Sequence, residues 1–368
     1  MKVTFITTVN HNVGDDFVRA GLQYILQQHF KNQKIEFQNI HKHSCITSRY
    51  GFEWFRNERY SKYVDKLLPL CITRDRMFDA DLIVQSGAPV YWCHSEENNH
   101  CAEADWYRDL IVRRYLLRKE RIPFLNLAAG TCQRYDSDGS EFIKCMIDAP
   151  HIVKLFKLAK VTTLRDALAQ KVLKKLGCVA PVIPCSSIFA KDFHQLPDLA
   201  KEYVVLNYMS GGAHYRFGQK IDDAQWENNF RALYKNIAKH ERVVFSCHNQ
   251  KEIDEAKKID ASAEIFFSTD YIEYMKFYSK AKFGILNRVH GAFLIASFGK
   301  PAFVIGNDTR AKMTEEIGLT SCFVNDATVD VLMEQYDFLQ SGADSFTERF
   351  AEIKTTAFAD YMKALSAV

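Results

Sequence analysis

The hydrophobic positions of this chain form short apolar runs that alternate with longer segments of helical periodicity. Runs of three to five apolar residues indicate buried strands, and spacings of three and four indicate helices between them. In the first half we expect strands at 3–7, 34–38, 82–85, 124–127 and 161–163, with helices at 16–29, 106–120 and 166–176. This alternation is typical of a parallel, doubly wound sheet.

The second half of the chain begins the same alternation again. It predicts strands at 203–207, 242–246, 264–267, 283–286 and 302–305, with helices at 223–240, 250–259, 271–279 and 291–298. We therefore expect an α/β protein with two Rossmann-like doubly wound domains, GT-B-like, and an interdomain cleft. The expected divisions are an N-terminal domain at 1–190, a C-terminal domain at 200–342 and a last helix within 343–368 that crosses back. The segment 181–199, with three prolines, predicts the linker.

One strand–helix–strand unit places charged side chains together. The strand at 283–286 leads into Arg288 and His290, and the loop after the strand at 302–305 carries Arg310 and Lys312. Gly299 suits the left-handed position that ends the helix between the strands. Parallel strands end on one edge of the sheet, where ligands of open α/β sheets bind. The pattern predicts an anion site with an imidazole able to transfer a proton.

Composition narrows the function classes. The chain has 368 residues, 47% of them hydrophobic, and its net charge is only +3, so no general attraction to nucleic acid is expected. The ten cysteines show no CxxC pair, which indicates a reduced, cytoplasmic protein and no metal site. Cys93, His94, His100 and Cys101 are the alternative metal-ligand set. The first strand is too short for a signal peptide, and no segment is apolar for about 20 residues, the length of a membrane span.

Two segments in the first half are rich in aromatic and basic residues. The stretch at 49–63 could form a lid on sugar rings or rest on a membrane surface, and the helix at 106–120 adds Arg113, Arg114, Arg118 and Lys119. The alternative is a packed aromatic cluster beside an ordinary solvated helix face. We include peripheral contact with the inner face of the membrane among the expectations.

Several short motifs, in this order and spacing, resemble the polysaccharide pyruvyl transferase family. They are Asn12-Val13-Gly14-Asp15-Asp16, then Thr163-Leu164-Arg165-Asp166 before Leu176-Gly177, then Arg288-Val289-His290-Gly291-Ala292 before Gly299-Lys300-Pro301. The resemblance covers the chain from the first strand through Leu319. It implies a GT-B-like transferase that moves a pyruvyl group from phosphoenolpyruvate to two hydroxyls of a sugar, for a capsule or other exopolysaccharide of the cell envelope.

The resemblance implies roles for particular residues. The family's basic donor-binding residues and its histidine fall on Arg165, Arg310 and His290, and we add Arg288 and Lys312 to the donor site. Asp15 is the second candidate catalytic residue, as base on a sugar hydroxyl. The candidate acceptor-binding residues are Asn12, Gly14, Asp16 and Trp92. Phosphoenolpyruvate is the expected co-substrate, with no cofactor and no metal, and the partner is a sugar or lipid-linked oligosaccharide.

The chain departs from the family pattern at three places, which leaves alternatives open. A glycine triplet is replaced by Ser86-Gly87-Ala88-Pro89, an Asp-Pro pair by Pro184-Cys185-Ser186-Ser187, and a lysine by Arg310. A glycosyltransferase with a nucleotide-sugar donor, using Asp270 for the ribose, and a sugar- or lipid-binding accessory protein remain the other hypotheses.

Each candidate group also has a purely structural interpretation. His290 could cap a loop while Arg288 forms an interdomain ion pair, and Arg165 could bridge to the sheet. The loop at 10–16 could be only an Asx turn and helix cap. The Gly-Gly loop at 210–216 could cradle a phosphate or form a solvated turn.

Overall fold

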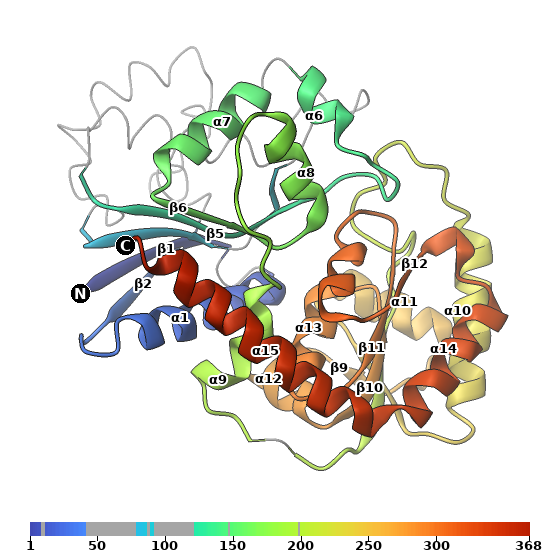
Figure 1. Ribbon diagram of the computed structural model, residues 1–368. Helices are drawn as coiled ribbons and strands as arrows, with labels where there is room; N and C mark the ends of the chain where they lie inside the picture. The colour runs from blue at the N-terminus through green and yellow to red at the C-terminus, as the bar shows by residue number, and fades with distance from the viewer. Residues whose placement is uncertain (9–11, 42–78, 87–88, 92–120, 146–147, 198) are drawn as a thin grey trace, which may run out of the picture.

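The computed structural model describes residues 1–8, 12–41, 79–86, 89–91, 121–145, 148–197 and 199–368. Two α/β lobes, each built on a parallel sheet, lie side by side (Figure 1). This architecture confirms the predicted fold class. The segments at 49–63 and 106–120, and the possible ligand set at 93–101, lie outside the described residues.

The N-terminal sheet has the strand order β2-β1-β3-β5-β4, and β6 pairs with β5. Every described pair is parallel. Helix α1 (Val13–His29) follows β1, and α8 (Ala167–Lys175) follows β6. The strands are β1 (Lys2–Thr7), β2 (Glu36–His41), β3 (Leu82–Ser86), β4 (Pro89–Tyr91), β5 (Phe124–Thr131) and β6 (Val161–Leu164).

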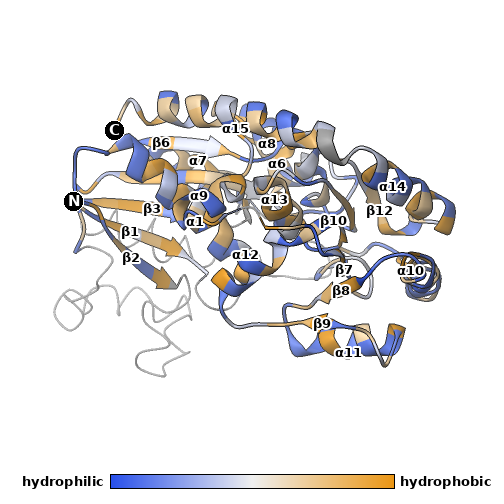
Figure 2. Ribbon diagram, turned by 90° about the horizontal axis from the view of Figure 1, so that it is seen from below, coloured by the Kyte–Doolittle hydropathy of each residue, from blue (hydrophilic) through white to orange (hydrophobic). Residues whose placement is uncertain are grey.

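The C-terminal sheet has the order β12-β11-β10-β7-β8-β9 and is also parallel. Apolar strands fill its centre, and the outward helix faces are polar, as the orange strands and blue helix surfaces of Figure 2 show. Its strands are β7 (Tyr203–Asn207), β8 (Val243–Ser246), β9 (Ile265–Phe266), β10 (Ala281–Leu286), β11 (Ala302–Gly306) and β12 (Ser321–Phe323). Its covering helices are α10 (Asp223–Ile237), α11 (Gln250–Ile259), α12 (Tyr271–Ser279), α13 (Val289–Ser297) and α14 (Val329–Ser341).

The predicted strand–helix–strand unit is confirmed as β10–α13–β11. Gly299 follows the C-cap of α13 with φ of 72°, a left-handed conformation that costs glycine little. All residues of α13 from Gly291 to Ser297 are buried, because the helix lies between its own sheet and the other lobe. Arg288 is the N-cap of this helix, so its first turn opens at the carboxyl end of β10.

The two lobes share one hydrophobic core. Helix α1 packs against α13 and α12, and the cluster runs from Phe5 and Phe17 of the first lobe to Leu286 and Phe293 of the second. At Gly21 the backbone of α1 comes very near the 3₁₀ helix η4 (Ser186–Phe189), because a Cβ there would lie 1.7 Å from the carbonyl oxygen of Ser186. The backbone of α1 is therefore packed directly against η4, which in turn packs on α13.

The predicted linker is more structured than its prolines indicated. It contains the 3₁₀ helix η4 (Ser186–Phe189) and helix α9 (Ala190–Phe193). All four residues of η4 are buried, and η4 packs on both α1 and α13. Helices this short have no clear hydrophobic periodicity in the sequence, so they could not be predicted. Here tertiary packing stabilises them.

Two further connections hold the lobes together. The loop after β11 pairs with the loop after β5: Thr309 N–H donates to the Gln133 carbonyl at 2.8 Å, and Gln133 N–H donates to Thr309 Oγ1 at 3.1 Å. Helix α15 (Ala343–Leu365) begins on the C-terminal lobe and ends beside β6, where Lys160 Nζ donates to the Val368 carbonyl (Figure 1). The proposed domain boundaries themselves stay predictions.

Several described elements were not predicted from the sequence. These are β4, β12, α14, η5 (Ala311–Ile317), α6 (Ser140–Lys144) and α7 (Asp148–Leu158). No helix in the described part of the chain has the length and apolar composition that a bilayer crossing requires.

Candidate functional site

A guanidinium and an imidazole from different lobes meet where α1, β6 and α13 converge. Arg165 Nη1 lies 3.2 Å from His290 Nε2, although 125 residues separate the two in the chain. Arg165 is fully buried at the end of β6, and its own N–H donates to the Ala129 carbonyl of β5. Arginine only donates hydrogen bonds, so Nε2 of His290 accepts and its proton resides on Nδ1.

The backbone of β5 is bent to admit Arg165. Ala128 has φ of 52°, an uncommon value for a residue with a side chain, and the pairing of β5 with β6 shifts register there. Its N–H donates to Thr163 Oγ1 at 2.9 Å. At the next glycine, Gly130, a Cβ would lie 2.5 Å from Arg165 Nε. A bulge and a glycine therefore leave the room that the guanidinium occupies.

Gly14 gives His290 its place against α1. A Cβ at Gly14 would lie 2.6 Å from Nδ1 of His290, closer than any real contact allows. Asn12 caps α1, and its Oδ1 accepts from the Gly14 N–H at 3.2 Å. The helix cap considered as the structural interpretation of this loop is thus present, and it directs the first turn of α1 toward the imidazole.

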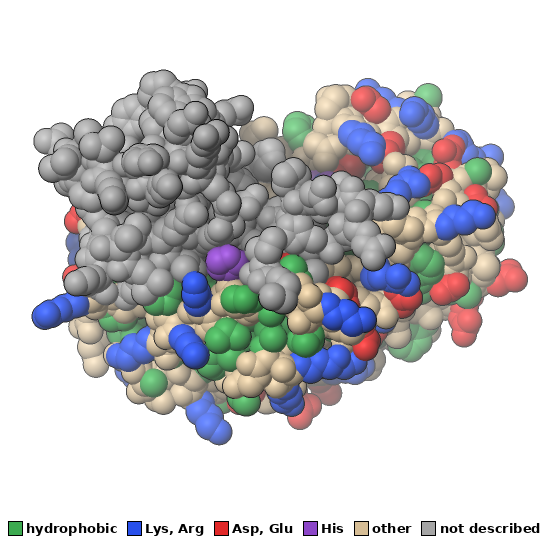
Figure 3. Space-filling view, turned by 90° about the horizontal axis from the view of Figure 1, so that it is seen from above, with side chains coloured by type: hydrophobic (Ala, Val, Ile, Leu, Met, Phe, Trp, Pro, Cys, Tyr) green, Lys and Arg blue, Asp and Glu red, His purple; other side chains and the backbone are tan. Residues whose placement is uncertain are grey.

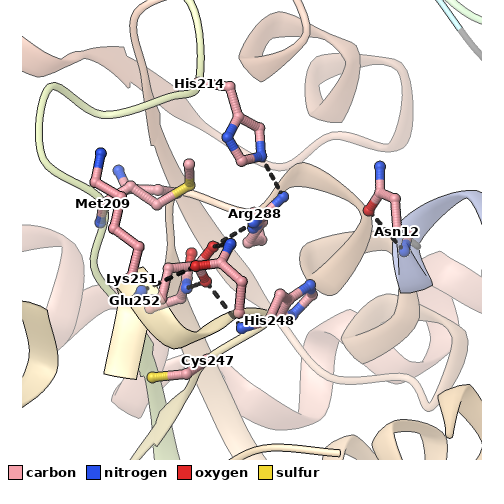
Figure 4. Close-up of polar contacts among 12 residues, drawn as sticks. Asn12, Met209, His214, Cys247, His248, Lys251, Glu252 and Arg288 are labelled. Carbon is pink, nitrogen blue, oxygen red and sulfur yellow. Dashed lines mark hydrogen bonds and ion pairs between the residues drawn. The ribbon is translucent and has the colours of Figure 1, made fainter. Parts of the chain in front are cut away.

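Arg288 is held from two sides within the C-terminal lobe. Its Nη2 forms an ion pair with Glu252, and its Nη1 lies 2.6 Å from Nε2 of His214. Figure 4 shows Arg288 between these two partners, with the dashed lines that mark both contacts. The ion pair lies inside one lobe, so the interdomain ion pair considered from the sequence is wrong.

Glu252 is a residue that sequence reasoning missed. It is 2% exposed, and its carboxylate accepts hydrogen bonds from Asn207 Nδ2 (3.1 Å), the His248 N–H (3.0 Å) and Asn249 Nδ2 (2.8 Å), besides Arg288. Asn249 and Glu252 follow the pattern of a helix-capping pair, which was the one available signal. That signal predicts a cap for α11 and says nothing of Arg288.

Arg310 also has a carboxylate partner. Its Nε and Nη2 bind both oxygens of Asp308, at 2.9 and 2.6 Å. Lys312 points elsewhere, with Nζ 4.5 Å from the centre of the Tyr135 ring. The guanidinium groups of Arg288 and Arg310 therefore keep only part of their N–H groups for a ligand, since each has five in total.

The two neighbouring aspartates of α1 differ in surroundings. Asp16 forms a buried ion pair with Arg19 at 2.6 Å, which gives it a structural partner. Asp15 lies in the first turn of α1 and is 5% exposed. Among these two, Asp15 is the better candidate for contact with a substrate.

The environment of His290 keeps its imidazole neutral. Burial lowers its pKa well below the usual value, and Arg165, Arg310, Arg288 and His248 lower it further. A dianionic ligand in the same place would raise that pKa, because it would favour the imidazolium form. Protonation of His290 would then depend on the bound anion.

The structure brings together many of the predicted site residues. Arg165, His290 and Gly14 are in contact, and Arg288 and Arg310 lie close enough to His290 to influence its pKa. Asp16 and Lys312 have other partners, and Trp92 lies outside the described residues. Asp270, the ribose candidate of the glycosyltransferase hypothesis, caps α12 by accepting from the Ile272 N–H at 2.8 Å.

The described part of the face that Figure 3 shows carries scattered charges. Lys and Arg side chains lie there among hydrophobic side chains and, over part of the surface, among Asp and Glu. Among the described residues, no cluster of three or more His, Cys, Asp or Glu side chains is arranged to hold a metal ion. The candidate functional site is therefore the contact of Arg165 with His290, together with Arg288 and Arg310.

Comparison with known sequences gives one family. The model of a family described as polysaccharide pyruvyl transferase matches residues 12–309 of this chain. No curated protein matches the sequence.

Comparison with solved structures gives the fold. The S. aureus MnaA protein in complex with UDP has a TM-score of 0.56 and 16% identity, covering 95% of this chain and 91% of that one. UDP-GlcNAc 2-epimerase from Neisseria meningitidis, bound to UDP-GlcNAc, has a TM-score of 0.56 and 11% identity over 99% of both chains. The epimerase from Methanocaldococcus jannaschii has a TM-score of 0.55 and 11% identity, covering 92% and 93%. These similarities establish a GT-B-like fold and no more.

Proposed function

Since the chain belongs to the polysaccharide pyruvyl transferase family, we propose that it transfers a pyruvyl group from phosphoenolpyruvate to two hydroxyls of a sugar. The product is a cyclic ketal, and inorganic phosphate leaves. A cytoplasmic setting, with a sugar or lipid-linked oligosaccharide as acceptor, completes the proposal. One observation carries it: Arg165 and His290 meet across the two lobes, beside Arg288 and Arg310.

The two anionic groups of phosphoenolpyruvate match the arginines, which come from both lobes. Phosphoenolpyruvate has a carboxylate and a phosphate, so it needs cationic groups at two places. Arg165 lies on the first lobe, whereas Arg288 and Arg310 follow strands of the second. We assign the carboxylate to Arg165 and the phosphate to the two C-terminal arginines, because a guanidinium donates paired hydrogen bonds to either anion.

The proton balance assigns work to His290 and Asp15. The methylene carbon gains one proton, a first hydroxyl attacks the resulting cationic carbon, and the second hydroxyl closes the ring as phosphate leaves. The two hydroxyl groups lose two protons. In the overall balance one of them ends on the methylene carbon and the other ends on the released phosphate. His290 delivers the proton to carbon once the bound anion has raised its pKa, and Asp15 accepts a proton from a hydroxyl.

The acceptor would lie at the amino end of α1. Asn12 and Gly14 form the turn beside His290, and Trp92 remains a further acceptor-binding candidate. No cofactor or metal enters this scheme, which needs only the donor's own phosphate as leaving group.

Ligand-dependent stabilisation tests the donor. A ligand that binds only the folded state raises the unfolding temperature, so phosphoenolpyruvate should raise it and UDP-GlcNAc should not. A structure with the bound donor should then show Arg165 at the carboxylate. Stabilisation by UDP-GlcNAc alone would favour the nucleotide-sugar transferase.

Product analysis tests the reaction. Incubation with phosphoenolpyruvate and candidate sugar acceptors should release phosphate only when an acceptor is present. The acceptor should gain the mass of pyruvic acid less one water. If the donor binds and no acceptor of any class is modified, the chain acts as a binding protein and the transfer proposal is wrong.

A further inference from the structure

His214 lies in the loop after β7, a segment that the sequence left undecided between a phosphate loop and a solvated turn. The side chain is exposed, yet Nε2 is 2.6 Å from Nη1 of Arg288. Because arginine only donates, Nε2 accepts and the proton of this imidazole resides on Nδ1. The pair therefore combines a fixed positive charge with one N–H donor of defined position.

The loop that carries His214 is hydrogen-bonded to the residues that follow β10 and β11, the strands that lead to Arg288 and Arg310. Asn287, next to Arg288, accepts from the Met209 N–H at 2.8 Å, and Asn307, after β11, donates to the Gly211 carbonyl at 2.7 Å. Gly211 and Gly212 have φ of 73° and 79°, and a Cβ at Gly212 would lie 2.9 Å from Val324. These contacts indicate a built loop, in contrast to a solvated turn.

His214 lies near both C-terminal arginines. The surrounding groups remove part of the water around the imidazole, and this desolvation, followed by the charges of Arg288 and Arg310, lowers its pKa to about 3. The imidazole is thus neutral at physiological pH and remains a hydrogen-bond donor through Nδ1. Glu252 fixes Arg288 from the opposite side, so Glu252, Arg288 and His214 form a continuous chain from the buried carboxylate in the first turn of α11 to the exposed loop.

We propose that His214 is a phosphate-binding residue: its Nδ1–H donates to an oxygen of the phosphate group that Arg288 and Arg310 hold. The identity of that phosphate as part of phosphoenolpyruvate rests on the proposed function. The geometry itself requires only a phosphate monoester, a diphosphate or inorganic phosphate. The role is donor recognition, and it leaves proton transfer to His290.

Calorimetric titration of the full chain with inorganic phosphate, phosphoenolpyruvate and UDP tests this inference. His214→Phe keeps the ring shape and removes both nitrogens, so we expect about 10- to 100-fold weaker binding of phosphate and of phosphoenolpyruvate, the usual effect of one hydrogen bond to a charged group. His240→Phe, at an exposed histidine beyond α10, is the matched control and should bind as the original chain does.

Two amide variants separate ligand contact from support of Arg288. His214→Asn places an amide near the position of Nδ1, and His214→Gln places one near Nε2, where it meets Arg288. Direct donation to phosphate predicts that Asn retains more affinity than Gln or Phe. If His214 only supports Arg288, Gln should retain the most, and the inference is wrong.

The remaining outcomes decide between the two proposals. Equal phosphate affinity in His214→Phe and the original chain, or no binding of any phosphate compound, overturns the inference. Phosphate binding that depends on His214, without preference for phosphoenolpyruvate and without ketal formation, supports the site and contradicts the proposed function. Binding of UDP with the same dependence identifies a diphosphate ligand.

Discussion

The same chemical pair, an arginine that donates to Nε2 of a histidine, occurs twice among the residues that the structure describes. Arg165 and His290 meet between the lobes, whereas Arg288 and His214 meet at the edge of one lobe. In the first pair Nδ1 faces the backbone of α1 at Gly14, and in the second the imidazole belongs to an exposed side chain. The hydrogen bond to arginine therefore does not by itself assign a role to either histidine. The surroundings of each pair have to be considered as well.

The two pairs also respond differently to movement of the lobes. The distance between Arg165 and His290 depends on how α1 packs against α13, because the two residues lie on different lobes. Arg288 and His214 belong to one lobe and are fixed by Asn287, Asn307 and Glu252. Changes at the interlobe pair should alter catalysis most, and changes at the edge pair should alter donor binding.

The largest expected effect is on the rate of ketal formation. His290→Ala should lower kcat by about 10²- to 10⁴-fold, the usual contribution of a general acid or base, while phosphoenolpyruvate still binds. His214→Ala should instead raise KM for the donor with a smaller change in kcat. Rates and donor affinities of both variants check this, with His240→Ala as control. Unchanged turnover in His290→Ala would remove His290 from the mechanism.

Two glycines of α1 separate an effect on stability from an effect on catalysis, because Gly21 packs against η4 and Gly14 packs against His290. Gly21→Ala forces a Cβ into the Ser186 carbonyl, so the free energy of unfolding should fall by about 1–3 kcal/mol. Gly14→Ala meets the movable side chain of His290, and alanine also favours the helix by up to about 1 kcal/mol. Its stability should change little, while displacement of the imidazole lowers the rate about 10²-fold.

Urea unfolding and steady-state rates on both glycine variants measure these effects. The wild-type chain is the reference in each assay. Equal losses of stability in the two variants, or full activity in Gly14→Ala, would show that His290 does not depend on this approach of α1.

The smallest effect concerns pH. Burial and the neighbouring Arg288 lower the pKa of His248. Burial, and then Arg165 and other nearby cations, lower the pKa of His290. Below pH of about 6.5 the unfolded chain binds protons that the folded chain does not, so stability is complete above neutrality and falls as pH decreases. The upper limit is about 1.4 kcal/mol per pH unit for each such histidine. His214, being exposed, should contribute less.

Urea unfolding at about pH 7.5 and about pH 5.5 measures that slope. His290→Phe should reduce it, and His240→Phe should leave it unchanged. A slope that is the same in both variants would show that His290 titrates alike in the folded and unfolded chains.

Much of the framework was predictable because it is local. The unit β10–α13–β11 was evident from two apolar runs, small helical residues and Gly299, and these alone place Arg288, His290 and Arg310 at one sheet edge. A helix cap in the loop at 10–16 was one of the two interpretations for the same reason, and Asn12 forms it. The elements η4 and α9 inside the predicted linker were not predicted, because they are short and their stability comes from contact with α1 and α13.

The partners of the charged residues were not predictable from local pattern. Glu252 has the sequence features of a capping residue and gives no sign of its pairing with Arg288, 36 residues away. His214 lies 74 residues from Arg288, in a loop whose shape depends on Asn287 and Asn307. The family resemblance identified Arg165 as a candidate, but its contact with His290 could be seen only in the structure, where the two lobes pack together.

The sequence by itself determined two parallel α/β lobes and the presence of cations and an imidazole at one strand edge, since periodicity, caps and strand direction are local properties. Tertiary structure alone decided which cations are neutralised by Glu252 and Asp308, and that Arg165 reaches His290. The physical reason is that hydrogen bonding and burial act between groups close in space, and the packing of α1 on α13 brings distant parts of the chain into that range.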